Sequence, residues 1–329
     1  MSWQKSLARI GDAVLDPTIV GAFGRGGFKR HQIGFDQGDL AVDLSGRVCA
    51  VTGANGGLGY ATAAGLAARG ATVWLLCRNQ ERGQKALDTL QATTGNPNLR
   101  LGIVDVASLE DIDRFVRHPP FESLDVLVNN AGILPTSRSS TAEGLDSTLA
   151  TNLVGPFALT AGLLPALESG RAARIIWVSS GGMYPRKLDL ERLWHPPDPF
   201  DGVTAYADTK RAMVVTSARM AKALESRGIA VHCMHPGWAD TPGVQSSIPG
   251  FWRMTRRMLR SPEEGADTTV WLAACDRAHA RSGLFWFDRV PRRTHFVPWT
   301  RHTPAAEDAF WQALHDWSRV DPQVFESRG

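Results

Sequence analysis

From about residue 47 onward, the chain alternates short apolar runs with longer amphipathic segments. The apolar runs are rich in Val, Ile or Leu, which is typical of strands buried on both faces of a parallel sheet. Helices between such strands give βαβ units. We therefore predict an α/β fold, with a single Rossmann-like, doubly wound parallel sheet of seven strands and helices on both faces. The strands are expected at residues 47–52, 72–77, 100–104, 124–129, 174–179, 230–234 and 284–287.

Most of the expected helices begin after Gly, Ser, Thr or Asp, residues that can satisfy the open backbone donors of a helix start. One domain is the better expectation for a chain of 329 residues, 43% of them hydrophobic. That domain would span residues 45–290, between an N-terminal extension (1–44) and a C-terminal helical extension (291–329). Its helices are expected at residues 57–69, 80–93, 109–116, 143–168, 204–226 and 262–275.

Each extension carries a helical pattern of apolar residues. At the N-terminus the pattern consists of Trp3, Leu7, Ile10 and Val14. Because few basic residues stand among them, packing against the protein or a partner subunit is favoured over binding to a membrane surface. At the C-terminus a helix over residues 304–320 is expected to pack one apolar face into the core. That face consists of Phe310, Leu314 and Trp317.

Composition excludes several classes of protein. The 36 basic and 33 acidic residues leave a formal net charge of +3 without a long run of one sign, which gives little support for nucleic-acid binding. The four cysteines lie in apolar segments without CxxC spacing, so we expect buried thiols and a reducing, cytoplasmic compartment. Neither a signal peptide nor an apolar run of about 18 residues occurs, so no transmembrane segment is expected. His232 and His235 lack a companion set of ligands, and no metal is predicted.

A glycine-rich turn follows the first expected strand and reads Thr52-Gly53-Ala54-Asn55-Gly56-Gly57-Leu58-Gly59. A strand, a glycine turn and then a helix place a phosphate at the helix N-terminus, where free N–H groups and the dipole attract negative charge. Gly53, Gly57 and Gly59 would serve the tight turn, the backbone approach and the helix packing. Alone, the turn could also be a structural loop; its combination with Tyr206 and Lys210, four residues apart downstream, points to a nicotinamide cofactor.

The end of the second strand distinguishes NAD from NADP, because an acidic residue there would bind the adenine-ribose diol and repel a 2′-phosphate. The sequence reads Leu76-Cys77-Arg78-Asn79 and has no carboxylate. Arg78 offers a planar cation suited to phosphate, so NADP(H) is favoured and NAD(H) is the alternative. The structural alternative for Arg78 is a surface ion pair.

Tyr206 and Lys210 stand four residues apart in an expected helix, and they carry the predicted chemistry. Hydride transfer to a carbonyl carbon creates negative charge on oxygen, so a proton source is needed beside it. A phenol titrates near pH ~10 in water, and an ammonium one helical turn away can lower that pKa. Tyr206 would supply the proton and, in reverse, tyrosinate would accept the proton of an alcohol.

Four motifs in this order resemble the short-chain dehydrogenase/reductase superfamily over residues 45–288. They are the glycine turn at 52–59, Asn129-Asn130-Ala131-Gly132, Tyr206-x-x-x-Lys210 and Pro236-Gly237. Residues 178–183 and 234–244 further resemble one branch of it, dehydrogenase/reductase SDR family member 12. Tyr206 follows Ser180 by 26 positions, and this long spacing resembles that of the retinol-dehydrogenase-like branches.

The resemblance implies a catalytic tetrad of Asn152, Ser180, Tyr206 and Lys210. Ser180 would bind the substrate oxygen; Ser179 is the alternative, since neighbours in a strand point to opposite sides. Asn152 matches the family asparagine that locally opens its helix and holds a water in a proton relay, and Lys210 would also bind nicotinamide-ribose hydroxyls. The cofactor-binding residues are expected to be Gly53, Asn55, Gly57, Leu58, Gly59, Arg78, Asp105, Val106, Asn129, Ala131, Gly132, Tyr206, Lys210, Pro236, Gly237 and Thr241.

Most of the long spacer between Ser180 and Tyr206 is formed by residues 186–202, which could lie over a substrate pocket. The apolar candidates to line that pocket are Met183, Trp194, Trp238 and Phe251. The same aromatic residues could equally pack the insertion. A mobile lid would be expected at residues 251–260.

The sequence thus predicts an NADP(H)-dependent oxidoreductase that interconverts a carbonyl and an alcohol on an apolar or mixed small molecule. One alternative is a sensor or scaffold that binds NADP(H) without turnover. A sugar-nucleotide epimerase or dehydratase is less favoured, because such relatives carry Gly-x-x-Gly-x-x-Gly and a larger C-terminal domain. The resemblance also suggests a homodimer through the helices expected at 143–168 and 204–226.

Overall fold

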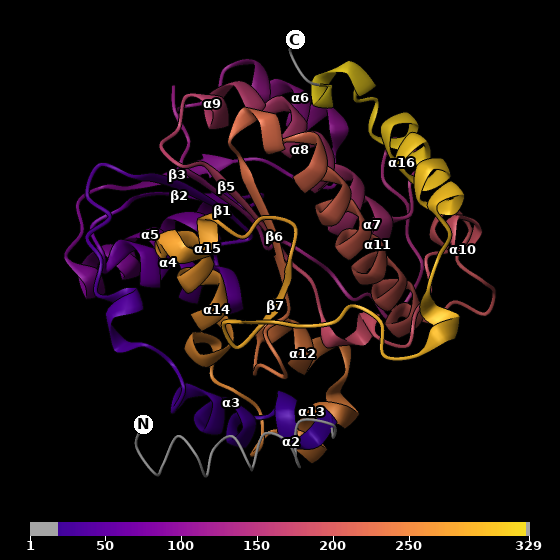
Figure 1. Cartoon of the computed structure of the whole chain (residues 1–329), viewed down its shortest axis with the longest axis horizontal. Helices are drawn as coiled ribbons and strands as arrows, with labels where there is room; N and C mark the ends of the chain where they lie inside the picture. The colour runs from indigo at the N-terminus through magenta and orange to yellow at the C-terminus, as the bar shows by residue number, and fades with distance from the viewer. Residues whose placement is uncertain (1–18, 327–329) are drawn as a thin grey trace.

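The computed structural model describes residues 19–326 and places one twisted sheet between two layers of helices (Figure 1). The strand order is β3-β2-β1-β4-β5-β6-β7-β8. The chain therefore winds outward from β1 in both directions, as the predicted doubly wound fold requires. The predicted helix from Trp3 to Val14 lies outside the described residues. The parallel strands are β1 Val48–Thr52, β2 Thr72–Cys77, β3 Leu99–Ile103, β4 Val126–Asn129, β5 Arg174–Val178, β6 Ala230–Met234 and β7 Phe285–Phe287.

The sheet has eight strands, so the predicted count of seven was wrong by one. The additional strand β8, Val290–Pro291, pairs antiparallel with β7. Asp288 and Arg289 form the turn between them, both with positive φ, as a tight hairpin requires. Two residues, one of them a proline at a sheet edge, are too few to show any periodicity in the sequence.

Strand side chains alternate between two hydrophobic clusters, one on each face of the sheet. In β1, Ala50 belongs to one cluster, whereas its neighbours Cys49 and Val51 belong to the other. The first cluster is covered by α6 Leu109–Arg117, α8 Gly155–Gly162, α9 Leu164–Glu168 and α11 Gly202–Ala223. The second is covered by α4 Gly57–Ala67, α5 Gln80–Thr94 and α14 Pro262–Ala274.

The helix predicted over residues 143–168 begins later and is irregular. It starts with α7, Ser147–Leu149, because the carboxylate of Asp146 accepts the backbone N–H of Thr148 (2.9 Å) and caps the helix there. A π-helical turn follows at Ala150–Val154. The helix breaks again before α9, whose second residue is Pro165, which has no N–H to donate.

The C-terminal helix α16, Pro304–Ser318, lies along α8 and α11 (Figure 1). Phe310 and Leu314 are fully buried, and Trp317 is partly buried, as their spacing predicted. Phe157 of α8 stacks on Phe325 beyond α16, with ring centroids 5.2 Å apart. The chain's own C-terminus therefore covers much of the helical face through which a homodimer was expected.

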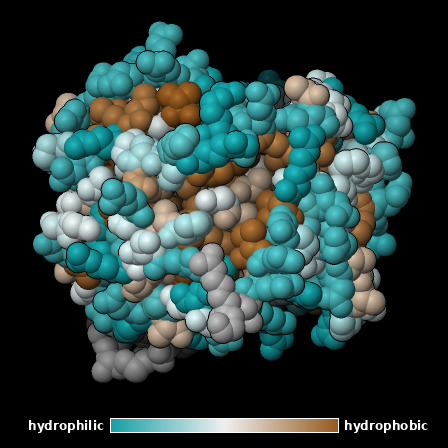
Figure 2. All heavy atoms as spheres, turned by 90° about the horizontal axis from the view of Figure 1, so that it is seen from above, coloured by the Kyte–Doolittle hydropathy of each residue, from teal (hydrophilic) through white to brown (hydrophobic). Residues whose placement is uncertain are grey.

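The remaining helical segments are short. They are α2 Ile19–Phe23, α3 Arg25–Gln32, α10 Leu190–Trp194, α12 Pro242–Ser247, α13 Pro249–Thr255, α15 Asp276–His279 and the single turns at Gln37–Leu40, Gly181–Met183, Glu225–Arg227, Pro298–Thr300 and Pro322–Phe325. Figure 2 shows a face where hydrophilic side chains prevail and apolar atoms gather near the middle. Among the described residues, no helix combines the length and apolar character needed to cross a membrane.

Replacement of Phe310 by alanine tests the packing of α16. Because this side chain is fully buried, we expect Phe310→Ala to lower the free energy of unfolding by about 3–5 kcal/mol in urea denaturation. The control is Phe296→Ala, since Phe296 is 65% exposed and packs mainly on one ring, that of Tyr184. We expect a loss below about 1.5 kcal/mol for the control. Equal losses for the two variants would contradict the packing described here.

Candidate active site

Thr52, the last residue of β1, joins the two halves of the sheet at their carboxyl edge. Its hydroxyl oxygen accepts the backbone N–H groups of Asn130 (3.0 Å) and Ala131 (2.9 Å). In return, the side-chain amide of Asn130 donates to the carbonyl of Thr52 (2.8 Å). These bonds hold the glycine turn beside the loop that follows β4, which is where a doubly wound sheet binds its ligand.

The glycines of the turn are required by close approaches. Gly53 and Gly57 have positive φ values of 66° and 54°. A Cβ at Gly59 would lie 2.4 Å from the carbonyl oxygen of Gly53, so only glycine lets α4 start this close to β1. A Cβ at Gly57 would lie 3.4 Å from Thr241, which caps α12 across the site.

The start of α4 suits an anion. Its N-cap is Gly56, no side chain caps the helix, and its first turn contains no acidic residue. The first backbone N–H groups of such a helix need acceptors, and the helix dipole favours negative charge there. Asn55 is exposed in the turn, whereas the side chain of Leu58 packs toward Gly265 of α14. The turn therefore fits the phosphates of a dinucleotide, which would contact its backbone.

Arg78 follows β2 at the same edge and is exposed. No ion pair or hydrogen bond of its side chain occurs among the described residues, so the surface ion pair considered as its alternative role is not formed there. The neighbouring Asn79 uses its side chain to cap α5, accepting the N–H of Arg82 (2.9 Å). The guanidinium of Arg78 remains available to a ligand.

The other expected cofactor residues line the same edge. Asp105 and Val106 follow β3; the carboxylate of Asp105 accepts the N–H of Ala107 (2.9 Å), and Val106 is buried. Asn129 directs its amide to Thr160 of α8 (2.9 Å), so it fastens the end of β4 to that helix.

Two loops complete this edge. Gly132 is exposed, and a Cβ added there would lie 3.5 Å from the Nζ of Lys210. Pro236 and Gly237 follow β6, and Gly237 has a φ of 73°.

Asn152 lies in the middle of the π-helical turn and is fully buried. Its oxygen accepts the N–H of Ile133 (2.8 Å), and its nitrogen donates to the carbonyl of Ile133 (3.0 Å) and to the hydroxyl of Thr209 (3.1 Å). The helix is thus locally widened where the resemblance expects it to open. Asn152 connects the loop after β4 to the helix that carries Tyr206 and Lys210.

The two serines after β5 point to different neighbours. Ser179 is buried and donates its hydroxyl to the carbonyl of Lys210 (2.9 Å), so it fixes the strand to α11. Ser180 is more exposed, accepts the N–H of Gly182 (3.2 Å), and lies close enough to Tyr206 to lower the pKa of that phenol. Of the two serines, only Ser180 lies next to Tyr206, the candidate proton donor.

Lys210 is 3% exposed and donates its ammonium to the carbonyl of Val178 (2.8 Å). The ammonium also lies 5.3 Å from the centre of the Tyr206 ring. Burial lowers the pKa of Lys210 to about 8. A cation of this kind is poised near neutral pH, as is common at functional sites.

The pKa of Tyr206 differs from the sequence expectation. Burial raises this pKa above its usual value, and the hydrogen bond with Ser180 lowers it in part. The expected lowering by Lys210 is not a main contribution, because the ammonium is directed to the Val178 carbonyl. Tyr206 is consequently protonated at neutral pH and can donate a proton to a substrate oxygen.

The four candidate substrate residues lie in different surroundings. Met183 is fully buried in the core. Trp194 stacks on Trp317 of α16, with ring centroids 5.2 Å apart. Trp238 and Phe251 are partly buried and meet edge to face at 5.3 Å, beside the loop that follows β6. Trp238 and Phe251 therefore form one contiguous apolar surface.

Asp208, between Tyr206 and Lys210 on α11, has a role that the sequence analysis missed. Its buried carboxylate pairs with Arg186 (2.5 Å) and Arg192 (3.2 Å), both from the insertion. The insertion is thereby fastened to the catalytic helix. Two sequence features could have indicated this role. They are the acidic residue two positions after Tyr206 and the two arginines of the insertion.

His232 and His235 occupy buried positions in and after β6. His235 stacks on Phe287, with ring centroids 4.0 Å apart, and His232 lies against Trp286. Burial lowers the pKa of each imidazole to about 3, so both are neutral. Across residues 19–326, no three His, Cys, Asp or Glu side chains are grouped so that they could hold a metal ion.

Comparison with known proteins agrees with this fold and site. The family model described as short chain dehydrogenase matches residues 47–188. Dehydrogenase/reductase SDR family member 12 of Bos taurus is 41% identical over 90% of this chain and 93% of its own. Retinol dehydrogenase 11 of Mus musculus is 32% identical over 75% of this chain and 79% of its own.

Two solved structures are similar over most of the chain. An uncharacterized protein from Mycobacterium paratuberculosis has a TM-score of 0.69 and 26% identity, over 86% of this chain and 97% of that chain. The L-sorbose reductase of Gluconobacter frateurii, complexed with NADPH and L-sorbose, has a TM-score of 0.58 and 27% identity, over 75% and 96%.

The fold and the site together define an oxidoreductase with an NAD(P)-binding Rossmann fold. The chain belongs to the short-chain dehydrogenase/reductase family. Within that family it is similar to the member 12 proteins, as the motifs at residues 178–183 and 234–244 predicted.

Proposed function

We propose that the protein is an NADP(H)-dependent oxidoreductase that interconverts a carbonyl and an alcohol on an apolar or mixed small molecule. The observation that carries this proposal is the meeting of Ser180, Tyr206 and Lys210 at the carboxyl edge of the sheet. Asn152 and Gly132 adjoin Lys210 from the other side. A donor, a proton source and a cation are thus gathered next to a turn suited to dinucleotide phosphates.

The preference for NADP(H) rests on the edge near Arg78. A 2′-phosphate needs a cation and the absence of a competing carboxylate, and the end of β2 meets both conditions. The structurally similar L-sorbose reductase is itself complexed with NADPH. NAD(H) remains the alternative cofactor, and the first binding experiment must distinguish it from NADP(H).

In the proposed reaction, bound NADPH supplies the hydride. Ser180 donates a hydrogen bond to the carbonyl oxygen, and Tyr206 transfers its proton to that oxygen as negative charge develops. Lys210, whose ammonium is held by the Val178 carbonyl, would bind the ribose hydroxyls of the cofactor. Asn152 holds the loop after β4 in place and would orient a water that returns a proton to the site.

The apolar or mixed character of the substrate is inferred from Trp238 and Phe251, whose rings adjoin the loop after β6. The insertion is fastened to Asp208, which lies on the same helix as Tyr206, and so would shape the opposite side of the pocket. A relative named retinol dehydrogenase 11 is consistent with an apolar alcohol as one substrate type.

Replacing Tyr206 by phenylalanine tests the catalytic assignment. We expect Tyr206→Phe to lower kcat by at least about 100-fold, because the proton donor is lost. NADPH oxidation would be followed with a panel of aldehydes, ketones and quinones. The control is Tyr60→Phe on α4, which should keep normal turnover.

Turnover by Tyr206→Phe at a near-normal rate would contradict the role of this residue. NADPH binding by the unmodified protein without turnover of any carbonyl would instead favour the sensor or scaffold alternative. A nicotinamide that stays bound and never exchanges would favour the epimerase or dehydratase.

Replacing Arg78 by alanine tests the cofactor preference. We expect Arg78→Ala to weaken NADPH binding about tenfold or more and NADH binding less than threefold, because only NADPH presents a 2′-phosphate. The measurement is the ratio of the dissociation constants for NADPH and NADH, each determined by cofactor fluorescence. Arg117→Ala serves as the control, since its exposed guanidinium pairs with Asp113 on α6. Equal losses for both cofactors would refute the assignment.

Cofactor binding should depend on pH through Lys210. Its pKa of about 8 means that the ammonium is present below pH 8 and is lost as the pH rises above it. If the ammonium binds the ribose hydroxyls, NADPH affinity should be nearly constant between about pH 7, where the 2′-phosphate is already ionised, and pH 7.5, and then fall by up to about tenfold per pH unit. Lys210→Met should bind weakly and lack this step. A flat profile in the unmodified protein would remove the proposed contact.

A further inference from the structure

Phe23, 8% exposed, packs beside the candidate active site, although it belongs to an N-terminal segment that the motifs do not include. A Cβ at Gly181, the residue after Ser180, would lie 2.4 Å from the Phe23 ring. The same ring is 6.2 Å from that of Trp238 in an edge-to-face arrangement. Phe23 therefore spans the gap between the serine loop and the loop after β6.

The backbone of this segment is joined to the loop after β6. The carbonyl of Phe23 accepts the N–H of Trp238 (2.9 Å), and the N–H of Arg25 donates to the carbonyl of Met258 (2.7 Å). A Cβ at Gly237 would lie 2.6 Å from the Phe23 carbonyl, so the two backbones meet without room for a side chain. These contacts fix the position of the Phe23 ring relative to Trp238.

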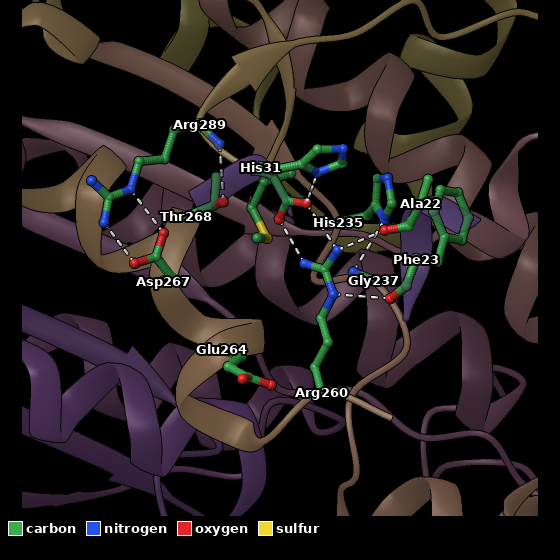
Figure 3. A network of polar contacts seen from close by, with 12 residues as sticks. Ala22, Phe23, His31, His235, Gly237, Arg260, Glu264, Asp267, Thr268 and Arg289 are labelled. Carbon is green, nitrogen blue, oxygen red and sulfur yellow. Dashed lines mark hydrogen bonds and ion pairs between the residues drawn. The ribbon is translucent and has the colours of Figure 1, made fainter. Parts of the chain in front are cut away.

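A buried arginine anchors the segment from below (Figure 3). Arg260, 1% exposed, donates to the carbonyls of Ala22 and Phe23 (both 2.9 Å). The same guanidinium forms a two-pronged pair with Asp288 (2.6 and 2.8 Å), and Asp288 also contacts His31 of α3 (2.5 Å). Buried charges are costly unless fully paired, so this network holds α2 and α3 in one place.

We propose that Phe23 forms a fixed wall of the substrate pocket and limits the bulk of the carbonyl compound that can reach Ser180. This inference rests on the proposed function and adds a specificity-determining residue to it. Phe23, Trp238 and Phe251 form a continuous row of rings, from the residue after Ser180 to the helix α13. Apolar rings of this kind select by shape and size.

A smaller and a larger side chain at position 23 test whether Phe23 limits the size of the substrate. Phe23→Ala should raise the ratio of kcat/KM for 2-naphthaldehyde to kcat/KM for hexanal about tenfold, because it makes room beside the pocket. Phe23→Trp should lower the same ratio by a similar factor. Phe23→Leu keeps apolar packing and replaces the alanine variant if that variant does not fold. It should raise the ratio by a smaller factor.

The matched control is Phe35→Ala. Phe35 belongs to the same N-terminal segment, but its ring packs on Phe28 and under the guanidinium of Arg289, away from Gly181. This variant should loosen the segment without changing the ratio. A change in the ratio equal to that of Phe23→Ala would show that general loosening, and not the Phe23 ring, sets the selectivity.

A binding measurement separates this inference from the proposed function. The fluorescent alcohol 2-naphthalenemethanol would be titrated into each protein saturated with NADPH, a mixture that cannot turn over. The wall predicts tighter binding by Phe23→Ala and weaker binding by Phe23→Trp, even if no carbonyl is reduced and the proposed function fails. Unchanged affinities and a ratio constant within about twofold, with turnover that still depends on Tyr206, would overturn the wall and leave the function standing.

Discussion

At the carboxyl edge of the sheet, the hydroxyl of Thr52 accepts two backbone N–H groups from the loop after β4. This contact fixes the distance between the glycine turn and Gly132, and therefore between the proposed dinucleotide site and Lys210. The strands it joins are far apart in the sequence and adjacent in the sheet. A doubly wound parallel sheet binds its ligand where its winding direction reverses, and the candidate site lies at that point.

Most residues of α11, the helix that carries the proposed acid, are buried, and its electrostatics follow from that burial. Lys210 shares its ammonium with the Val178 carbonyl and titrates at about 8, whereas Tyr206 stays protonated. A protonated phenol with a serine hydroxyl beside it is prepared to give a proton to a carbonyl oxygen. The same helix carries Asp208, so the insertion and the acid are positioned by one rigid element.

Much of this could be predicted from the sequence. The seven parallel strands, the glycine turn and the pair Tyr206 and Lys210 are local patterns, because strand alternation and the i+4 spacing depend only on neighbours in the chain. The strand β8 was missed because two residues have no period. The pKa of Tyr206 was expected to be lowered. The direction of its shift depends on the burial of the phenol and on the acceptor to which Lys210 donates. Both are set by residues far away in the sequence.

The sequence by itself determined the fold class and the family and predicted the residues of the proposed tetrad, since each is encoded in short ordered motifs. Only the tertiary structure decided that Phe23 lies against Gly181, that Arg260 pairs with Asp288 under the N-terminal segment, and that α16 covers α8 and α11. Such contacts join residues separated by as many as 257 positions, as between His31 and Asp288. No local periodicity records them, because they arise from the packing of elements whose order in space the sheet topology sets.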